Sequence, residues 1–78
     1  MAKSKYMEFD KIGDTGKTEI WNVISKSSEF ILGQIKWYGP WRQYCFYPSP
    51  HCVFNNGCMS DIQAFIKVLQ DKRRGRNG

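Results

Sequence analysis

The sequence predicts an α+β fold, in which a three-stranded antiparallel sheet is packed by one C-terminal helix. Three stretches rich in β-branched and aromatic residues, at about 18–25, 30–38 and 41–47, are separated by turn-forming residues, as consecutive strands are. Apolar residues at helical spacing then occupy about 58–73. A single helix that follows three strands buries its apolar stripe by lying across one face of their sheet.

These elements form one small α+β domain, which we place at residues 17–73. Residues 1–16 mix charged residues and glycines with a few apolar side chains and show no sustained period, so we expect a flexible N-terminal arm. Residues 74–78 are expected to form a basic, disordered tail, because Gly75 should stop the helix.

The first strand, at about 18–25, reads T-E-I-W-N-V-I-S and is closed by the polar residues 26–29. Its period of two allows either of two pairs to face the core, depending on the register that the next loop sets. One pair is Ile20 and Ile24, and the other is Trp21 and Val23. We favour Ile20 and Ile24 as the inward pair.

The second and third strands are predicted to form a hairpin around Gly39-Pro40. Glycine tolerates the positive φ at the first position of a type II′ turn and proline suits the second, so Tyr38 should lie opposite Trp41. Alternation then gives one mostly apolar face towards the helix and one face that mixes aromatic residues with glutamine and lysine. The apolar face comprises Ile31, Gly33, Ile35, Trp37, Arg42, Tyr44 and Phe46, and the mixed face comprises Leu32, Gln34, Lys36, Tyr38, Trp41, Gln43, Cys45 and Tyr47.

The helix at about 58–73 is the clearest element of the sequence. Its apolar stripe at helical period is formed by Cys58, Ile62, Phe65, Ile66 and Leu69. Asn56 or Ser60 can cap the start of this helix, and Ser60 with Gln63 forms a capping box. Basic residues near its end suit the negative end of the helix dipole.

Length and composition restrict the function. A chain of 78 residues has room for one small core and not for a large active-site cleft. No run approaches the roughly 18 to 20 apolar residues of a membrane span, and the first residues lack the pattern of a secretory signal. Three cysteines is an odd number, typical of reduced thiols, so we expect a cytoplasmic protein without a membrane partner.

Metal-binding and catalytic sites are not expected. Cys45, His51, Cys52 and Cys58 lie within fourteen residues, but their C-x5-H-C-x5-C spacing lacks the C-x2-C knuckle that grips zinc. His51 is the one histidine, and in an extended loop its side chain points away from that of Cys52. The seven acidic residues are scattered, so we predict no cofactor and no enzymatic activity.

Nucleic-acid binding has two supports in the sequence. Aromatic and polar side chains of the mixed face could stack bases and touch phosphates, and the basic residues near the C-terminus could attract the backbone. The candidate residues are Lys36, Tyr38, Trp41, Gln43, Tyr47, Lys72, Arg73, Arg74 and Arg76. Two plainer interpretations stay open: the basic tail keeps the protein soluble, or the aromatic face covers a second core packed by Tyr6 and Phe9.

The stretch 32–48, L-G-Q-I-K-W-Y-G-P-W-R-Q-Y-C-F-Y-P, followed by V-F-N and a helix that contains C-M-S-D-I, resembles a group of short uncharacterised proteins encoded by bacteria and their phages or prophages. The likeness covers roughly residues 18–70 and is specific around a W-Y-x-P-W-R-Q-Y-C-F-x-P core. The resemblance implies a bacterial or phage setting and no mechanism.

These observations together predict a small non-catalytic binding module of a bacterium or phage. Its ligand is expected to be nucleic acid, bound by the mixed face and the basic tail. The alternative is a protein-binding module, such as a phage inhibitor of a host protein or defence complex, because tryptophan and tyrosine are typical of interaction hot spots. A homodimer joined by sheet edges or by the aromatic face is a third possibility.

Overall fold

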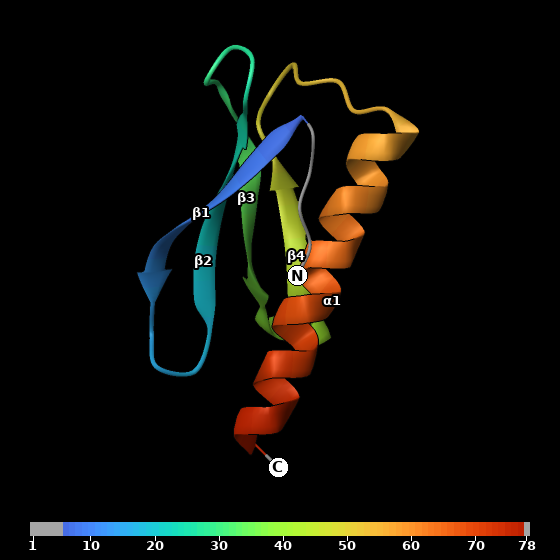
Figure 1. Cartoon of the computed structure of the whole chain (residues 1–78). Coiled ribbons are helices and arrows are strands. Elements are labelled where there is room, and N and C mark those ends of the chain that lie inside the picture. Colours follow the sequence, from blue (N-terminus) through green and yellow to red (C-terminus); the bar gives the residue numbers. More distant parts are fainter. Residues whose placement is uncertain (1–5, 78) are drawn as a thin grey trace.

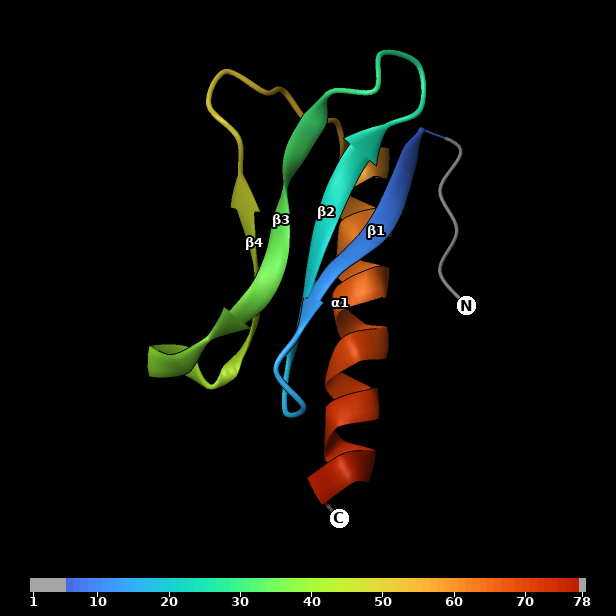
Figure 2. The ribbon, with the colours of Figure 1, turned by 90° about the vertical axis from the view of Figure 1, so that its left-hand side faces the viewer.

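The computed structural model describes the backbone of residues 6–77 and the side chains of residues 6–73. Four strands form one antiparallel sheet in the order β1-β2-β3-β4, and a single C-terminal helix lies across one face of it (Figures 1 and 2). The elements are β1 (Met7–Asp14), β2 (Glu19–Ser25), β3 (Ile31–Tyr38), a 3-10 turn (Gly39–Trp41), β4 (Gln43–Pro48) and α1 (Asn56–Asn77). The α+β class and the C-terminal helix are confirmed, but the sheet has four strands and not three.

The additional strand is β1, which lies within the stretch that we expected to be a flexible arm. Met7 and Phe9 turn towards the helix, where Met7 is buried and the Phe9 ring stacks on Phe65 with centroids 4.2 Å apart. A bulge between Lys11 and Gly13 interrupts the alternation of side chains along β1. The alternating pattern in the sequence is therefore too short to predict this strand. Residues 1–5 of the expected arm lie outside the described part.

The helix packs as its apolar stripe predicted. Ile62, Phe65 and Leu69 are buried against the sheet, and Cys58 and Ile66 pack beside them. Asn55 caps the helix, since its side-chain Oδ1 accepts a hydrogen bond from the backbone N–H of Cys58 at 2.8 Å. The cap is therefore neither Asn56 nor Ser60.

At its other end α1 continues through the backbone of Asn77, past the expected end near Arg73. Gly75 does not stop the helix, because glycine lowers helix stability without preventing the helical conformation. Within residues 6–77 no helix is both long enough and apolar enough to cross a membrane.

The inward face of β2 differs from the one we favoured. Val23 is fully buried and Trp21 packs edge-on against Phe65, with ring centroids 4.9 Å apart. The pairing of β2 with β3 sets Trp21 opposite Ile35 and Val23 opposite Gly33, which are buried residues on the helix side. Our choice of Ile20 and Ile24 as the inward pair was wrong.

The turn between β3 and β4 is a single 3-10 turn and not a two-residue type II′ turn. Pro40 fits the start of this turn because its fixed φ is helical, and the backbone N–H of Arg42 donates to the Gly39 carbonyl at 3.1 Å. Tyr38 is therefore opposite Gln43 rather than Trp41, and Ile35 is opposite Phe46.

This change moves the register by two residues, which leaves every strand side chain on its expected face. Three residues are exceptions. Ile31, which we placed on the apolar face, is 50% exposed and pairs with Ile24 beyond the β2–β3 bulge, so it does not belong to the core. Arg42 belongs to the turn and is exposed, so it is not part of the core face. Leu32 is the extra residue of a β2–β3 bulge and packs against the core rather than lying on the mixed face.

Candidate functional site

The face of the sheet that points away from α1 is here called the open face, and it is turned towards the viewer in Figure 2. Because side chains alternate along a strand, residues next to the buried Ile35 and Tyr44 point outward onto it. The register brings together four of the residues singled out from the sequence, namely Lys36 and Tyr38 on β3 with Gln43 and Tyr47 on β4.

Three aromatic rings form a continuous row on the open face. The Tyr38 ring stands at its centre, with its centroid 5.0 Å from Trp41 and 6.4 Å from Tyr47. The rings meet at interplanar angles of 79° and 65°, which are the edge-to-face arrangements that aromatic pairs prefer. Trp41 is nevertheless 67% exposed, so its indole contacts Tyr38 and presents most of its surface to solvent.

The position of Trp41 is fixed by the turn that carries it. Pro40 restricts the backbone immediately before it, and Arg42 immediately after it adopts a left-handed conformation with φ 53°. That conformation is unfavourable for a side chain other than glycine or asparagine. The tip of the hairpin therefore presents a tryptophan and an exposed arginine side by side in a defined local geometry.

Lys36 brings a positive charge to the same cluster. Its Nζ lies 4.5 Å from the centroid of the Tyr47 ring, within the range of a cation–π interaction. Desolvation, together with the neighbouring Cys45 and Tyr38, raises the pKa of the Tyr47 phenol above its usual value of 10.0. Tyr47 is thus a neutral ring and a hydrogen-bond donor at neutral pH, with an ammonium group beside it.

Two amide side chains on this face were not among our predicted site residues. Gln34 donates from Nε2 to the Oδ1 of Asn22 at 3.2 Å, across the β2–β3 pair. Only the facing of β2 reveals this pair, because Asn22 points outward when Val23 points inward. Further along, β1 adds the exposed acidic residues Glu8 and Asp10, so the open face runs from an acidic edge at β1 to a basic and aromatic edge at β4.

The basic residues of α1 are not brought to the open face. Lys72 Nζ forms a 3.0 Å ion pair with Glu19 Oε2, and the Arg73 guanidinium lies 4.1 Å above the Trp37 ring. Both contacts lie between the helix and the sheet, on the side opposite the aromatic row. The side chains of Arg74 and Arg76 lie outside the described part of the chain.

A polar network on the helix side explains why Lys72 is positioned there. Glu19 is buried and accepts a hydrogen bond from Trp21 Nε1 at 2.9 Å as well as the ion pair from Lys72. Burial by itself would raise the pKa of Glu19, but Lys72 and Trp21 outweigh it and hold the pKa below its usual value of 4.5. The Tyr44 hydroxyl accepts from the Glu19 backbone N–H at 2.9 Å, and Gln70 Oε1 accepts from the Tyr44 N–H.

The cysteine and histidine residues do not form a site that the structure can assign. Cys45 lies on β4, Cys58 lies in the first turns of α1, and all three thiols are free. Among residues 6–73, whose side chains are placed, no group of three or more histidine, cysteine or acidic side chains is arranged to hold a metal ion.

A known protein resembles this chain over almost its entire length. The chain is 33% identical over 75 residues to an uncharacterised 9.3 kDa protein of Acholeplasma phage L2, which covers 95% of this chain and 96% of the phage protein. The chain belongs to the family of this phage protein. That membership supports the expected group of uncharacterised phage proteins, while the aromatic motif that we took as its mark stays a prediction. No protein-family model and no solved structure matches the chain.

Proposed function

We propose that this member of the phage family is a small non-catalytic module of the bacterial cytoplasm that binds single-stranded nucleic acid through its open face. The observation that supports the proposal most directly is Trp41, because large aromatic side chains usually bury most of their surface whereas this one is 67% exposed. Tyr38 contacts the indole at an interplanar angle of 79°, and the exposed surface of the indole offers a platform on which a base can stack.

The aromatic row favours a single strand over a duplex. Bases within a duplex stack on one another and offer only their edges, whereas the bases of a single strand can lie on protein rings. Trp41, Tyr38 and Tyr47 follow one another along the hairpin, which suits successive bases of one strand. The Asn22 and Gln34 amides beyond them are suited to hydrogen bonds with base edges.

The charges of the open face suggest the path of the strand. Lys36 lies on β3 and the exposed Arg42 lies in the turn before β4, while Glu8 and Asp10 on β1 would repel phosphate. We therefore assign the strand to the β3–β4 hairpin. Two phosphate contacts to a single strand correspond to a slope of about −1.4 for the logarithm of affinity against the logarithm of salt concentration.

The basic residues of α1 receive an auxiliary role in this proposal. Lys72 and Arg73 already contact Glu19 and Trp37 on the helix side, so we assign sequence-independent attraction to Arg74 and Arg76. Their contribution should add to the salt dependence and leave the preference for single strands unchanged.

A titration of labelled single- and double-stranded DNA and RNA at low salt tests the proposal. Trp41→Ala should weaken single-strand binding by about 5- to 150-fold, since stacking on one ring contributes about 1 to 3 kcal/mol per base. Val68→Ala, at an exposed position on α1, is the matched control and should leave the affinity unchanged. A chain that ends at Arg73 should bind with a shallower salt slope.

Two outcomes would contradict the proposal. One is the absence of binding to any of the four nucleic acids. The other is binding that Trp41→Ala leaves intact and that is abolished in the chain ending at Arg73, because attraction would then come from the C-terminus alone. The truncation keeps the Lys72–Glu19 and Arg73–Trp37 contacts, so it should not disturb the fold.

The second candidate function is binding of a host protein, as a phage inhibitor would do. The observation that favours it is the pairing of Trp41 with Arg42 at the exposed hairpin tip, since these residue types dominate interaction hot spots. Affinity capture from a nuclease-treated bacterial lysate separates the two functions. A protein retained by the wild-type chain and lost with Trp41→Ala would favour protein binding over nucleic-acid binding.

A further inference from the structure

The β2–β3 loop lies at the end of the molecule opposite the turn between β3 and β4 (Figure 1), and the segments at this end carry several exposed apolar residues. Four segments meet there: the start of β1, the β2–β3 loop with the start of β3, the loop before α1, and the first turn of α1. Within the described part of the chain, five of the eight exposed large hydrophobic residues lie on these segments. They are Tyr6, Phe30, Ile31, Val53 and Met59, of which Phe30 is 71% and Val53 is 93% exposed.

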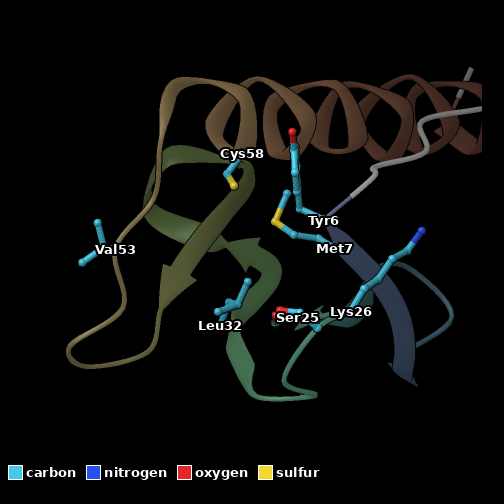
Figure 3. Close-up of a pocket in the computed structure, with 8 residues that line it drawn as sticks. Tyr6, Met7, Ser25, Lys26, Leu32, Val53 and Cys58 are labelled. Atoms are coloured by element: carbon cyan, nitrogen blue, oxygen red, sulfur yellow. The ribbon is translucent and has the colours of Figure 1, made fainter.

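A pocket of about 390 Å³ opens between the same segments. Figure 3 shows Met7, Leu32 and Cys58 converging from β1, β3 and α1, while the Lys26 ammonium points outward. Phe30 precedes Leu32 by two residues and does not line this pocket. One end of the molecule therefore carries both an exposed aromatic side chain and an apolar hollow.

We propose that this end is a two-fold interface with a second copy of the chain, in which the β2–β3 loop of each copy packs over the pocket of the other. Phe30 of each copy enters the pocket of its partner. A protrusion and a hollow on one surface satisfy each other reciprocally only under two-fold symmetry, which is the commonest symmetry of protein dimers.

The charges of the β2–β3 loop are self-complementary in this arrangement. Lys26 and Glu29 are opposite charges three residues apart in one exposed loop. A two-fold axis between two such loops sets Lys26 of each copy against Glu29 of the partner subunit. The C-terminal end of α1, which contains Lys72, Arg73, Arg74 and Arg76, would instead repel a second copy.

The area of the patch is close to what a weak dimer needs. With large side chains exposing roughly 150 to 250 Å² when fully accessible, the exposed fractions of the five residues correspond to on the order of 600 Å² per copy. Stable interfaces bury about 800 Å² per partner, and smaller ones are transient. We therefore expect a weak dimer whose population depends on the protein concentration.

Sedimentation equilibrium of the full chain tests the interface. The mass should rise with concentration from 9.1 kDa towards twice that value, 18.2 kDa. Lys26→Glu and Glu29→Lys should each weaken the dimer by about tenfold, because each puts like charges together at the paired loops. An equimolar mixture of the two variants should recover the wild-type mass, since opposite charges then meet at both contacts.

Phe30→Ser should abolish the dimer without affecting the fold, because this side chain makes little contact within its own chain. Trp41→Ala should stay dimeric, which separates this inference from the proposed nucleic-acid site. A mass that remains at 9.1 kDa throughout, or a mixture of the charge variants that fails to recover the dimer, would overturn the two-fold arrangement. In the first case the patch would face a different protein.

Discussion

Two cation–aromatic pairs lie on opposite faces of the β3–β4 hairpin. One of them is covered by the helix, and the other is not. Arg73 lies over Trp37 between the helix and the sheet, whereas Lys36 lies over Tyr47 on the open face. The first pair belongs to the contacts that hold α1, and the second is available to a ligand. Residues of one chemical type are thus divided between stability and binding by the face on which they lie.

The same division separates neighbours along the chain. Trp37 meets Tyr44 edge-on beside the helix, and the adjacent Tyr38 meets Trp41 and Tyr47 on the other side of the sheet. Composition alone would assign all of these rings to one aromatic cluster. The alternation of a β-strand divides them into two clusters on opposite faces of the sheet.

The largest expected effect comes from filling the close contact at Gly33 on the helix side. A Cβ on Gly33 would lie 2.6 Å from both the Phe46 ring and the Tyr47 carbonyl oxygen. We expect Gly33→Ala to lower the free energy of unfolding by about 3 kcal/mol, which is most of the stability of a domain this small. Urea denaturation followed by tryptophan fluorescence measures it.

Gly39→Ala is the matched control for this experiment. Nothing lies within 4 Å of a Cβ at Gly39, at the start of the 3-10 turn. Its free energy of unfolding should stay within about 0.5 kcal/mol of the wild type. Equal stabilities of the two variants would show that Phe46 does not pack over Gly33 in solution.

The second comparison replaces each of two tryptophans, one on either face of the sheet, by alanine. Trp37→Ala should lower the free energy of unfolding by about 2 to 3 kcal/mol, because it removes the surfaces that contact Arg73 and Tyr44. Trp41→Ala should cost less than about 0.5 kcal/mol, since the side chain is mostly exposed. Thermal unfolding measured beside the single-strand titration should show stability lost in one variant and affinity lost in the other.

A reversal of this pattern would break the comparison. If Trp41→Ala unfolded the chain while Trp37→Ala bound nucleic acid less tightly, the open face would be structural and the helix side would carry the ligand.

The smallest of the three effects concerns Glu19 and pH. Because the pKa of the folded-state carboxyl lies below its usual value of 4.5, its charge stabilises the folded protein above that pH. This stabilisation is lost as the pH falls through the lowered pKa. We expect Glu19→Gln to cost about 1 to 2 kcal/mol at pH 7 and to flatten the acid side of the stability profile.

Glu8→Gln provides the comparison, since Glu8 is exposed on the open face. Urea denaturation of the three proteins between pH 7 and the acid limit of folding measures the difference. If the free energy of unfolding of the wild type depended on pH as weakly as that of Glu19→Gln, the Lys72–Glu19 ion pair would not contribute to holding the helix.

Much of the site was predictable because strand alternation survives an error of two residues. Our type II′ turn was wrong, yet Lys36, Tyr38, Gln43 and Tyr47 still reached one face, since a shift of two preserves the side on which each residue lies. The roles of Lys72 and Arg73 were not predictable, because their contacts with Glu19 and Trp37 join residues far apart in the sequence.

The sequence by itself determined the helix and the two faces of the hairpin, because periodicity is a local property that each segment carries alone. The tertiary structure decided the rest. It recruited β1 by stacking Phe9 on Phe65, turned Trp21 and Val23 inward, and buried Glu19 beneath Lys72. Each of these outcomes depends on a partner distant in the chain, and the energy of packing against that partner outweighs the weak local preferences of these segments.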